Sequence, residues 1–371
     1  MKQISVVVAD SSPFVCRLLK TYLESVPDIR VIGAANKGQQ FVEMIASQHP
    51  DVATLGLEMP DMTGLDALQS LQRTCPTPAV IISGANMHAA AMTLEALHYG
   101  AVDFVCKFTP GTNVAPESLR QEIINKVRLA AGANAAGPTM PADAYDIKPG
   151  TNAKLKKLLS GLGAVSLPTL DITSTKEVAA ATEPLPPEQI VVIGASTGGP
   201  VALQQLLSQL PADFSGSVLV IQHLPPTFTA VLAEQMARQL NLRVKEAESG
   251  DCLQRGAVLI APGGMNIRLD EAGTLQCVSA SSYEDNVPSI NLAMESAAAV
   301  YSTQVRGILL TGMGEDGVAG LAAIRQQGGI TYAQSLDTCT VKGMPQRAME
   351  AEVVDYTAPP QQIARLLLAG Y

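Results

Sequence analysis

The stretch QIVVIGASTGGPVALQQLLSQL, residues 189–210, decides how the second half of the chain is interpreted. Its apolar run at 190–193 is rich in β-branched residues and predicts a buried strand. G-x-S-x-G follows at 194–198, and leucines at helical spacing come next. Strand, tight glycine turn and helix are the setting of a nucleophile elbow. The pattern predicts that Ser196 lies at the carboxyl edge of a sheet, beside a helix N-terminus that stabilises negative charge.

The same turn could instead bind a phosphate group through its backbone amides, as helix N-termini do. It lacks the lysine of a Walker motif, however, and it does not fit G-x-G-x-x-G. These departures favour a nucleophilic serine over a nucleotide site.

Length and composition limit the classes of protein to which the chain can belong. Its 371 residues predict two or three domains, and 47% hydrophobic residues are enough for packed cores. A net charge of −9 without a basic block argues against nucleic acid as a partner. No apolar run reaches the ~20 residues of a membrane span, and the N-terminal run is too short for a signal peptide. Six scattered cysteines without C-x-x-C are typical of reduced thiols in a cytoplasmic protein, and four histidines leave little scope for metal binding.

Residues 1–125 alternate five strand patterns with five helix patterns, which predicts a doubly wound parallel sheet. In such sheets, sites form at the carboxyl ends of the strands. The sequence places Asp10, Gly56, Ser83 and Lys107 at these positions.

This half resembles the receiver domain of response regulators, most clearly in EMPDMTGLDAL (58–68) and GAVDFVCK (100–107). The resemblance implies two acids that bind Mg²⁺, an aspartate that is phosphorylated, and a Ser/Thr and a lysine on neighbouring strands. Asp10, Ser83 and Lys107 fit that pattern. Ser11 stands where the second acid is expected, and Gly56 stands where the phosphoacceptor is expected.

These departures predict a degenerate receiver that does not accept phosphate. Glycine has no side chain to carry a phosphoryl group, and loss of one carboxylate weakens a site for a hard cation. We expect Asp10 and Lys107 to pair with each other at the vacated position.

Residues 126–186 are interpreted as a linker, because much of the segment is rich in small residues and proline and lacks periodicity. AKLKKLLSGLG (153–163) could form one or two amphipathic turns within it. Residues 187–371 return to strand–helix alternation and predict a second three-layer α/β domain with a mainly parallel sheet.

A reactive serine needs a base, and His223 is the only histidine in 187–371. It ends the predicted strand 217–223, which places it on the same sheet edge as Ser196. Asp316, in the glycine-rich turn TGMGEDG (311–317), is the favoured carboxylate to orient the histidine. Its rivals are Asp337, Asp251 and Glu315, and the alternative role for Asp316 itself is a helix N-cap. The order Ser, His, Asp differs from that of the α/β-hydrolase fold.

Five motifs make the second half similar to the protein-glutamate methylesterase domain of chemotaxis, which usually follows a receiver. They are GASTGGP (194–200), QHLPPTFT (222–229), IAPGG (260–264), LTGMGEDG (310–317) and VKGMP (341–345). The resemblance implies that Ser196 is the nucleophile, His223 the general acid/base and Asp316 its orienting partner. It also implies that Thr197 and Met313 border the active site, as backbone amide donors to the oxyanion.

The implied reaction is hydrolysis of glutamate γ-methyl esters on the cytoplasmic part of chemoreceptors, with deamidation of glutamines as a further activity and no cofactor. A chemotaxis histidine kinase is a further expected partner. Two alternatives stay open, a non-catalytic signalling adaptor and an acyl hydrolase of different substrate range. Regulation also stays open: the receiver could be permanently open, moved by another partner, or inhibitory until the linker is cleaved.

Overall fold

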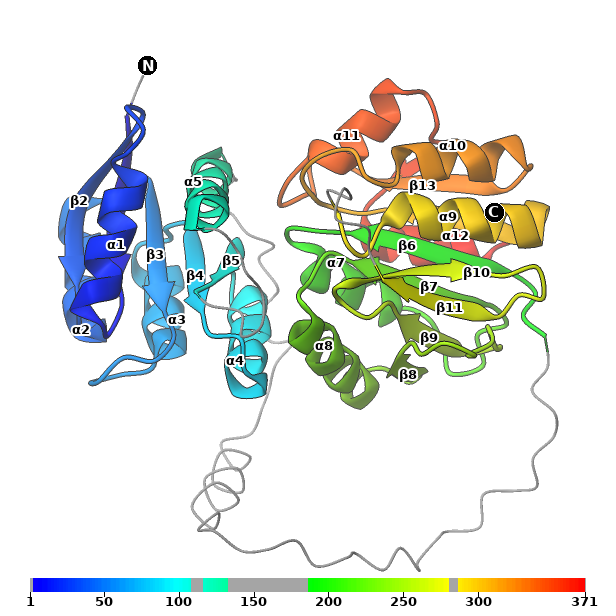
Figure 1. Cartoon of the computed structure of the whole chain (residues 1–371), viewed down its shortest axis with the longest axis horizontal. Helices are drawn as coiled ribbons and strands as arrows, with labels where there is room; N and C mark the ends of the chain where they lie inside the picture. Colours follow the sequence, from blue (N-terminus) through cyan, green and yellow to red (C-terminus); the bar gives the residue numbers. More distant parts are fainter. Residues whose placement is uncertain (1–2, 108–115, 133–185, 280–285, 371) are drawn as a thin grey trace, which may run out of the picture. The chain divides into compact units, whose positions relative to one another are not determined.

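Strands and helices alternate through the first 132 residues of the chain. The computed structural model describes residues 3–107, 116–132, 186–279 and 286–370. The first set of elements is β1 (Ile4–Ala9), α1 (Pro13–Leu23), β2 (Ile29–Ala35), α2 (Gly38–Gln48), β3 (Val52–Gly56), α3 (Gly64–Thr74), β4 (Ala79–Ser83), α4 (Met87–His98), β5 (Asp103–Cys106) and α5 (Pro116–Gly132). The strands form a parallel sheet in the order β2-β1-β3-β4-β5 (Figure 1).

Helices cover both faces of this sheet, as a parallel sheet requires. Val6 and Val8 of β1 pack in one cluster with α1 and α5, whereas Val7 and Ala9 pack in another with α2, α3 and α4. The strand therefore has no face exposed to water, which explains why its sequence is a continuous apolar run rather than an alternating one.

Helix α5 corrects the expected start of the linker. It continues to Gly132 and buries Val127 and Ala130, so residues 126–132 belong to the first domain. The remainder of the expected linker through 185, including the amphipathic turns at 153–163, lies outside the described residues.

A second series of elements follows. It comprises β6 (Ile190–Ala195), α7 (Gly199–Leu207), β7 (Ser217–Gln222), α8 (Pro226–Gln239), β8 (Arg243–Glu246), β9 (Ala257–Ile260), β10 (Met265–Leu269), β11 (Leu275–Ser279), α9 (Ile290–Tyr301), the short 3₁₀ helix η2 (Ser302–Gln304), β12 (Val305–Leu309), α10 (Val318–Gln326), β13 (Ile330–Gln334), α11 (Gly343–Glu350), β14 (Tyr356–Ala358) and α12 (Pro360–Leu368). Seven of these strands form a parallel sheet in the order β14-β13-β12-β6-β7-β9-β8.

Two layers of helices sandwich this second sheet. Alternate residues of β6 divide between them, with Val191 and Ile193 packing against α7, α8 and α12, and Ile190 and Val192 against α9 and α10. The hairpin of β10 and β11 is antiparallel and belongs to the α9 side (Figure 1). The predicted fold class, two mainly parallel three-layer α/β domains, is therefore confirmed.

Candidate active site

The carboxyl ends of β6 and β7 bring Ser196 and His223 to the same level of the sheet. Ala195 pairs in register with Gln222, so Ser196 and His223 are the residues that come directly after each paired position. The His223 amide donates to Ala195 O at 3.0 Å, and Gln222 Nε2 donates to Ser196 O at 2.9 Å. Because Gln222 is buried, its side chain fixes the serine backbone from the neighbouring strand.

The turn that carries Ser196 is held on both sides. Its amide donates to Thr311 O at 3.1 Å, and its carbonyl accepts from Gly199 N at 2.8 Å. Gly198 has φ +78°, whereas Ser196 does not have a positive φ. In this turn the left-handed residue is thus the glycine two positions after the serine, a conformation that favours glycine.

Asp316 is the carboxylate that the structure places beside His223. His223 Nε2 donates to Asp316 Oδ2 at 2.9 Å, which leaves Nδ1 of the ring for a second partner. In the described part of the chain no hydrogen bond joins Ser196 Oγ to the imidazole. Catalytic hydrogen bonds of this kind are often formed only when substrate is bound.

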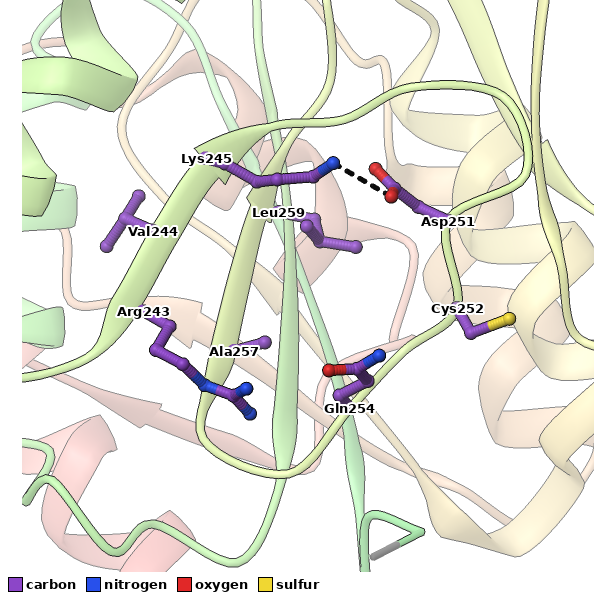
Figure 2. Close-up of a pocket in the computed structure, with 8 residues that line it drawn as sticks. All are labelled: Arg243, Val244, Lys245, Asp251, Cys252, Gln254, Ala257 and Leu259. Carbon is purple, nitrogen blue, oxygen red and sulfur yellow. Dashed lines mark ion pairs between the residues drawn. The ribbon is translucent and has the colours of Figure 1, made fainter. Parts of the chain in front are cut away.

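The three rival carboxylates are elsewhere engaged or exposed. Asp251 forms an ion pair with Lys245 at 2.8 Å, in a pocket of about 360 Å³ beside the edge strand β8 (Figure 2). Asp337 and Glu315 are exposed to solvent.

The buried carboxylate of Asp316 is held by more than the imidazole. Oδ2 also accepts from the Ile290 amide at 2.8 Å, and Oδ1 accepts from the Asn291 amide at 2.9 Å. Burial opposes ionisation, but the hydrogen bonds from His223 and these two amides outweigh it and hold the pKa of Asp316 below its ordinary value. The N-cap of α10 is Gly317, so Asp316 does not cap the helix that follows it.

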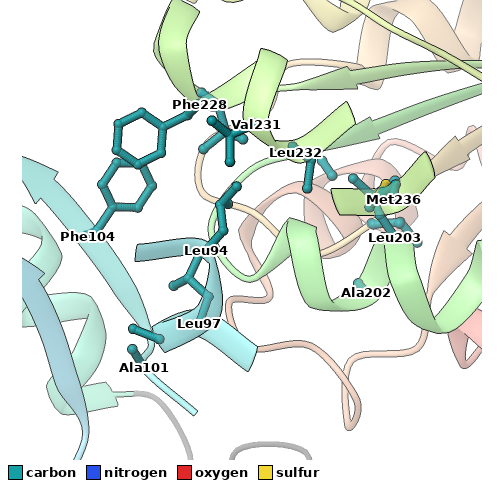
Figure 3. Packing of buried hydrophobic residues seen from close by; sticks show 14 of the residues in the cluster. Leu94, Leu97, Ala101, Phe104, Ala202, Leu203, Phe228, Val231, Leu232 and Met236 are labelled. Atoms are coloured by element: carbon teal, nitrogen blue, oxygen red, sulfur yellow. The ribbon is translucent and has the colours of Figure 1, made fainter. Parts of the chain in front are cut away.

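Thr197 and Met313 occupy different environments. Thr197 is buried, whereas the Met313 side chain is 47% exposed. Behind this turn, Leu203 of α7 and Met236 of α8 belong to one buried apolar cluster (Figure 3).

The expected receiver residues also lie at strand ends. Asp10 follows β1 and is buried, Gly56 ends β3, Ser83 ends β4 and Lys107 follows β5, whereas Ser11 is exposed. The expected ion pair is present, since Lys107 Nζ contacts Asp10 Oδ2.

Asp10 fills the space beside Gly56. A Cβ added at Gly56 would lie 2.7 Å from Asp10 Oδ2, closer than such atoms approach. The hydroxyl of Ser83 is also hydrogen-bonded, because its Oγ lies 2.6 Å from Thr93 Oγ1.

Among the described residues there is no group of three or more His, Cys, Asp or Glu side chains that could hold a metal ion. None of the described helices is long and apolar enough to cross a membrane.

Two family models match this chain, and each covers the part that contains one of the two parallel sheets. The model described as response regulator receiver domain matches residues 6–123, and the model described as CheB methylesterase matches residues 191–367. These matches define the class, a receiver followed by a methylesterase domain.

Relatives extend that match over nearly the whole chain. The protein-glutamate methylesterase/protein-glutamine glutaminase of Symbiobacterium thermophilum is 36% identical over 363 residues, which are 98% of this chain and 96% of the relative. The protein of the same name from Caldanaerobacter subterraneus is 38% identical over 374 residues, 99% of this chain and 96% of the relative. The crystal structure of the Thermotoga maritima CheB methylesterase catalytic domain has 35% identity and a TM-score of 0.48, and covers 49% of this chain and 98% of its own. The chain belongs to the CheB family of protein-glutamate methylesterases/protein-glutamine glutaminases.

Two residues near the site were not found by sequence reasoning, namely Gln222 and Asn291. Gln222 opens the motif QHLPPTFT (222–229), but neither that motif nor the strand pattern it ends predicts that its side chain contacts the serine turn. Asn291 lies in the helical stretch after Ser289, where no motif marks it. Only the tertiary structure relates either residue to Ser196 or Asp316.

Proposed function

We propose that this protein hydrolyses glutamate γ-methyl esters on the cytoplasmic part of methyl-accepting chemoreceptors, with Ser196, His223 and Asp316 as the catalytic triad. The observation that carries the proposal is the hydrogen bond from His223 to Asp316 at the sheet edge where Ser196 directly follows the adjacent strand. Membership of the methylesterase family supports the choice of substrate.

In the first half-reaction, Ser196 Oγ attacks the ester carbonyl while His223 Nδ1 accepts the hydroxyl proton. Asp316, ionised, accepts the hydrogen bond from Nε2 and stabilises the imidazolium. The amides of Thr197 and Met313 donate to the oxyanion, which is the largest stabilising effect expected in such sites. The carbon–oxygen bond to the methoxy group then breaks, and methoxide takes the proton from His223 and leaves as methanol.

In the second half-reaction, His223 removes a proton from water as the water attacks the acyl carbonyl. The bond from the acyl carbon to Ser196 Oγ then breaks, and His223 returns the proton to Oγ, which releases the glutamate side chain and the free serine. A glutamine side chain follows the same path with ammonia as the leaving group. The residues of the chain supply every proton transfer in this scheme, so it requires no cofactor.

We further propose that the receiver does not take part in phosphoryl transfer. Gly56 offers no carboxylate, and Asp10 is bound to Lys107 in the adjacent space. The second acid position is an exposed serine, Ser11. Regulation by a histidine kinase through this site is therefore not expected.

The test measures methanol release from methylated receptor membranes by the full-length protein. Ser196→Ala should reduce release to the level of the blank, whereas Ser208→Ala, an exposed serine at the end of α7, should leave it unchanged. Release by Ser196→Ala at the unmodified rate would refute the triad. Hydrolysis of small esters without methanol from receptors would indicate an acyl hydrolase of another substrate range, and no hydrolysis of either would favour an adaptor.

A further inference from the structure

The helices α9 and α10 begin side by side, and a side chain at the start of each accepts hydrogen bonds from the first amides at the start of the other. Ser289, the N-cap of α9, accepts from Leu292 N in addition. At the start of α9, the amides of Ile290 and Asn291 donate to the two oxygens of Asp316, at 2.8 and 2.9 Å. These are among the first amides of the helix, which have no acceptor within it. Asp316 comes from the loop that leads into α10, so one helix is capped by the approach to the other.

The opposite cap comes from Asn291. The N-cap of α10 is Gly317, which has no side chain to accept from the first amides of its own helix. Asn291 Oδ1 takes that role from the neighbouring helix, accepting from Gly317 N and Gly320 N, both at 2.9 Å. A side-chain oxygen at this position is what N-terminal amides ordinarily obtain from a local Ser, Thr, Asp or Asn.

The two helices pack closely where these hydrogen bonds form. A Cβ added at Gly320 would lie 2.5 Å from Met294 Cβ, and one added at Gly317 would lie 2.9 Å from Ile290 Cγ2. At these two positions the helices approach so closely that only glycine fits. At this contact the backbone amide of Asn291 donates to Asp316, and the side chain of Asn291 accepts from the amides of Gly317 and Gly320.

We infer that Asn291 is a positioning residue for the hydrolytic reaction, because its side chain fixes the loop that presents Asp316 to His223. The inference rests on the proposed function, in which Asp316 orients the imidazole. Asn291 touches neither Ser196 nor His223 by any hydrogen bond among the described residues, so it acts through Asp316. Loss of the acceptor should misplace the carboxylate and the imidazole while leaving the substrate surface intact.

Three substitutions in the full-length protein test this role. Asn291→Leu keeps the side-chain size and removes the acceptor, Asn291→Asp keeps an acceptor for both amides, and Asn241→Leu is a matched change at an exposed position. Each is assayed for kcat and KM on methylated receptor membranes. Each is also reacted with a fluorophosphonate probe, whose final stoichiometry counts folded sites and whose rate reports the reactivity of Ser196.

Asn291→Leu should lower kcat per labelled site and the labelling rate by about 10²-fold, as expected for a small misplacement of catalytic groups, with KM unchanged. Asn291→Asp should recover most of that loss, and Asn241→Leu should match the unmodified protein. An unchanged rate per labelled site in Asn291→Leu would overturn the inference, even if fewer sites are labelled, because that result indicates a purely structural role. Equal impairment of Asn291→Asp and Asn291→Leu would also overturn it.

The two readouts separate this inference from the proposed function. If the unmodified protein reacts with the probe but releases no methanol, the substrate assignment fails while the comparison of labelling rates still tests Asn291. If the unmodified protein does neither, the triad itself is refuted and the inference falls with it.

Discussion

The two parallel sheets both present polar side chains at the carboxyl ends of their strands, but only one edge leaves a reactive group uncommitted. In the first sheet Asp10 is bound to Lys107, and the hydroxyl of Ser83 is bound to Thr93. In the second, Ser196 Oγ has no hydrogen-bond partner among the described residues, and the imidazole beside it keeps one nitrogen free. The same architecture thus gives two different strand ends. In the first sheet the polar side chains bind one another, and we call this the closed edge; in the second the Ser196 hydroxyl is available to react, and we call this the open edge.

Removing the histidine should have the largest effect on this contrast. His223→Gln takes away the base, and kcat for methanol release should fall by roughly 10⁴–10⁶-fold, as it does when a triad acts as a unit. His88→Gln, an exposed histidine of α4, is the matched control and should leave kcat unchanged. A fall in kcat of less than tenfold in His223→Gln would mean that His223 is not the base that activates Ser196.

Asp316→Asn should lower the free energy of unfolding of the second domain by about 1–3 kcal/mol at neutral pH, the range for hydrogen bonds to a charged group. Because the pKa of Asp316 is lowered in the folded protein, this stabilisation is present above the ordinary value of 3.8 and is lost as the pH falls through the lower folded value. Calorimetry should therefore find a difference at pH 7 that shrinks below about pH 4. Asp213→Asn, an exposed carboxyl in the same half, is the control; a difference independent of pH would contradict this account.

Gly56→Ala tests whether the first edge is as closed as the ion pair suggests. The new Cβ would lie 2.7 Å from Asp10 Oδ2, so the buried carboxylate must move, at a cost of about 1–2 kcal/mol for a tightly packed site. Gly132→Ala is the matched control, because nothing lies within 4 Å of its added Cβ. Equal denaturation midpoints for the two variants would show that the space beside Gly56 is free.

The smallest expected effect is that of acetyl phosphate, which should be nil. With Mg²⁺ present, it should neither label the protein nor change the rate of methanol release, since Gly56 has no group to accept a phosphoryl. A receiver domain that carries the acceptor aspartate, labelled in parallel, is the positive control. Stable incorporation of phosphate into this protein would show that the first domain accepts a phosphoryl group, and would contradict the proposed difference between the two sheets.

Periodicity and motifs were sufficient to predict the fold class and the strand ends, because buried parallel strands are written as continuous apolar runs. Strands β8 and β10 were not predicted, since RVKE and MNIRL mix polar and apolar residues as edge and hairpin strands do. Helix α5 continues to Gly132, seven residues past the expected end of the first domain at 125.

At the candidate site, the glycine-rich turn after a predicted strand favours Asp316 over three rival carboxylates, and the hydrogen bond to His223 agrees with that preference. The sequence alone does not explain why Asp316 takes this position. Its carboxylate is held by a helix that begins 26 residues earlier, at Ile290. Such a contact depends on how two helices pack and leaves no local signature. Asn291 was missed for the same reason.

The exchange of caps between α9 and α10 has a consequence for how this region opens. Helix ends ordinarily fray independently, and their amides exchange with solvent at individual rates. Here the start of each helix holds an acceptor for amides of the other, so we expect the amides of Ile290, Asn291, Gly317 and Gly320 to open as a single cooperative unit. Deuterium should then enter these four amides together, and each opening event should break the contact that holds Asp316.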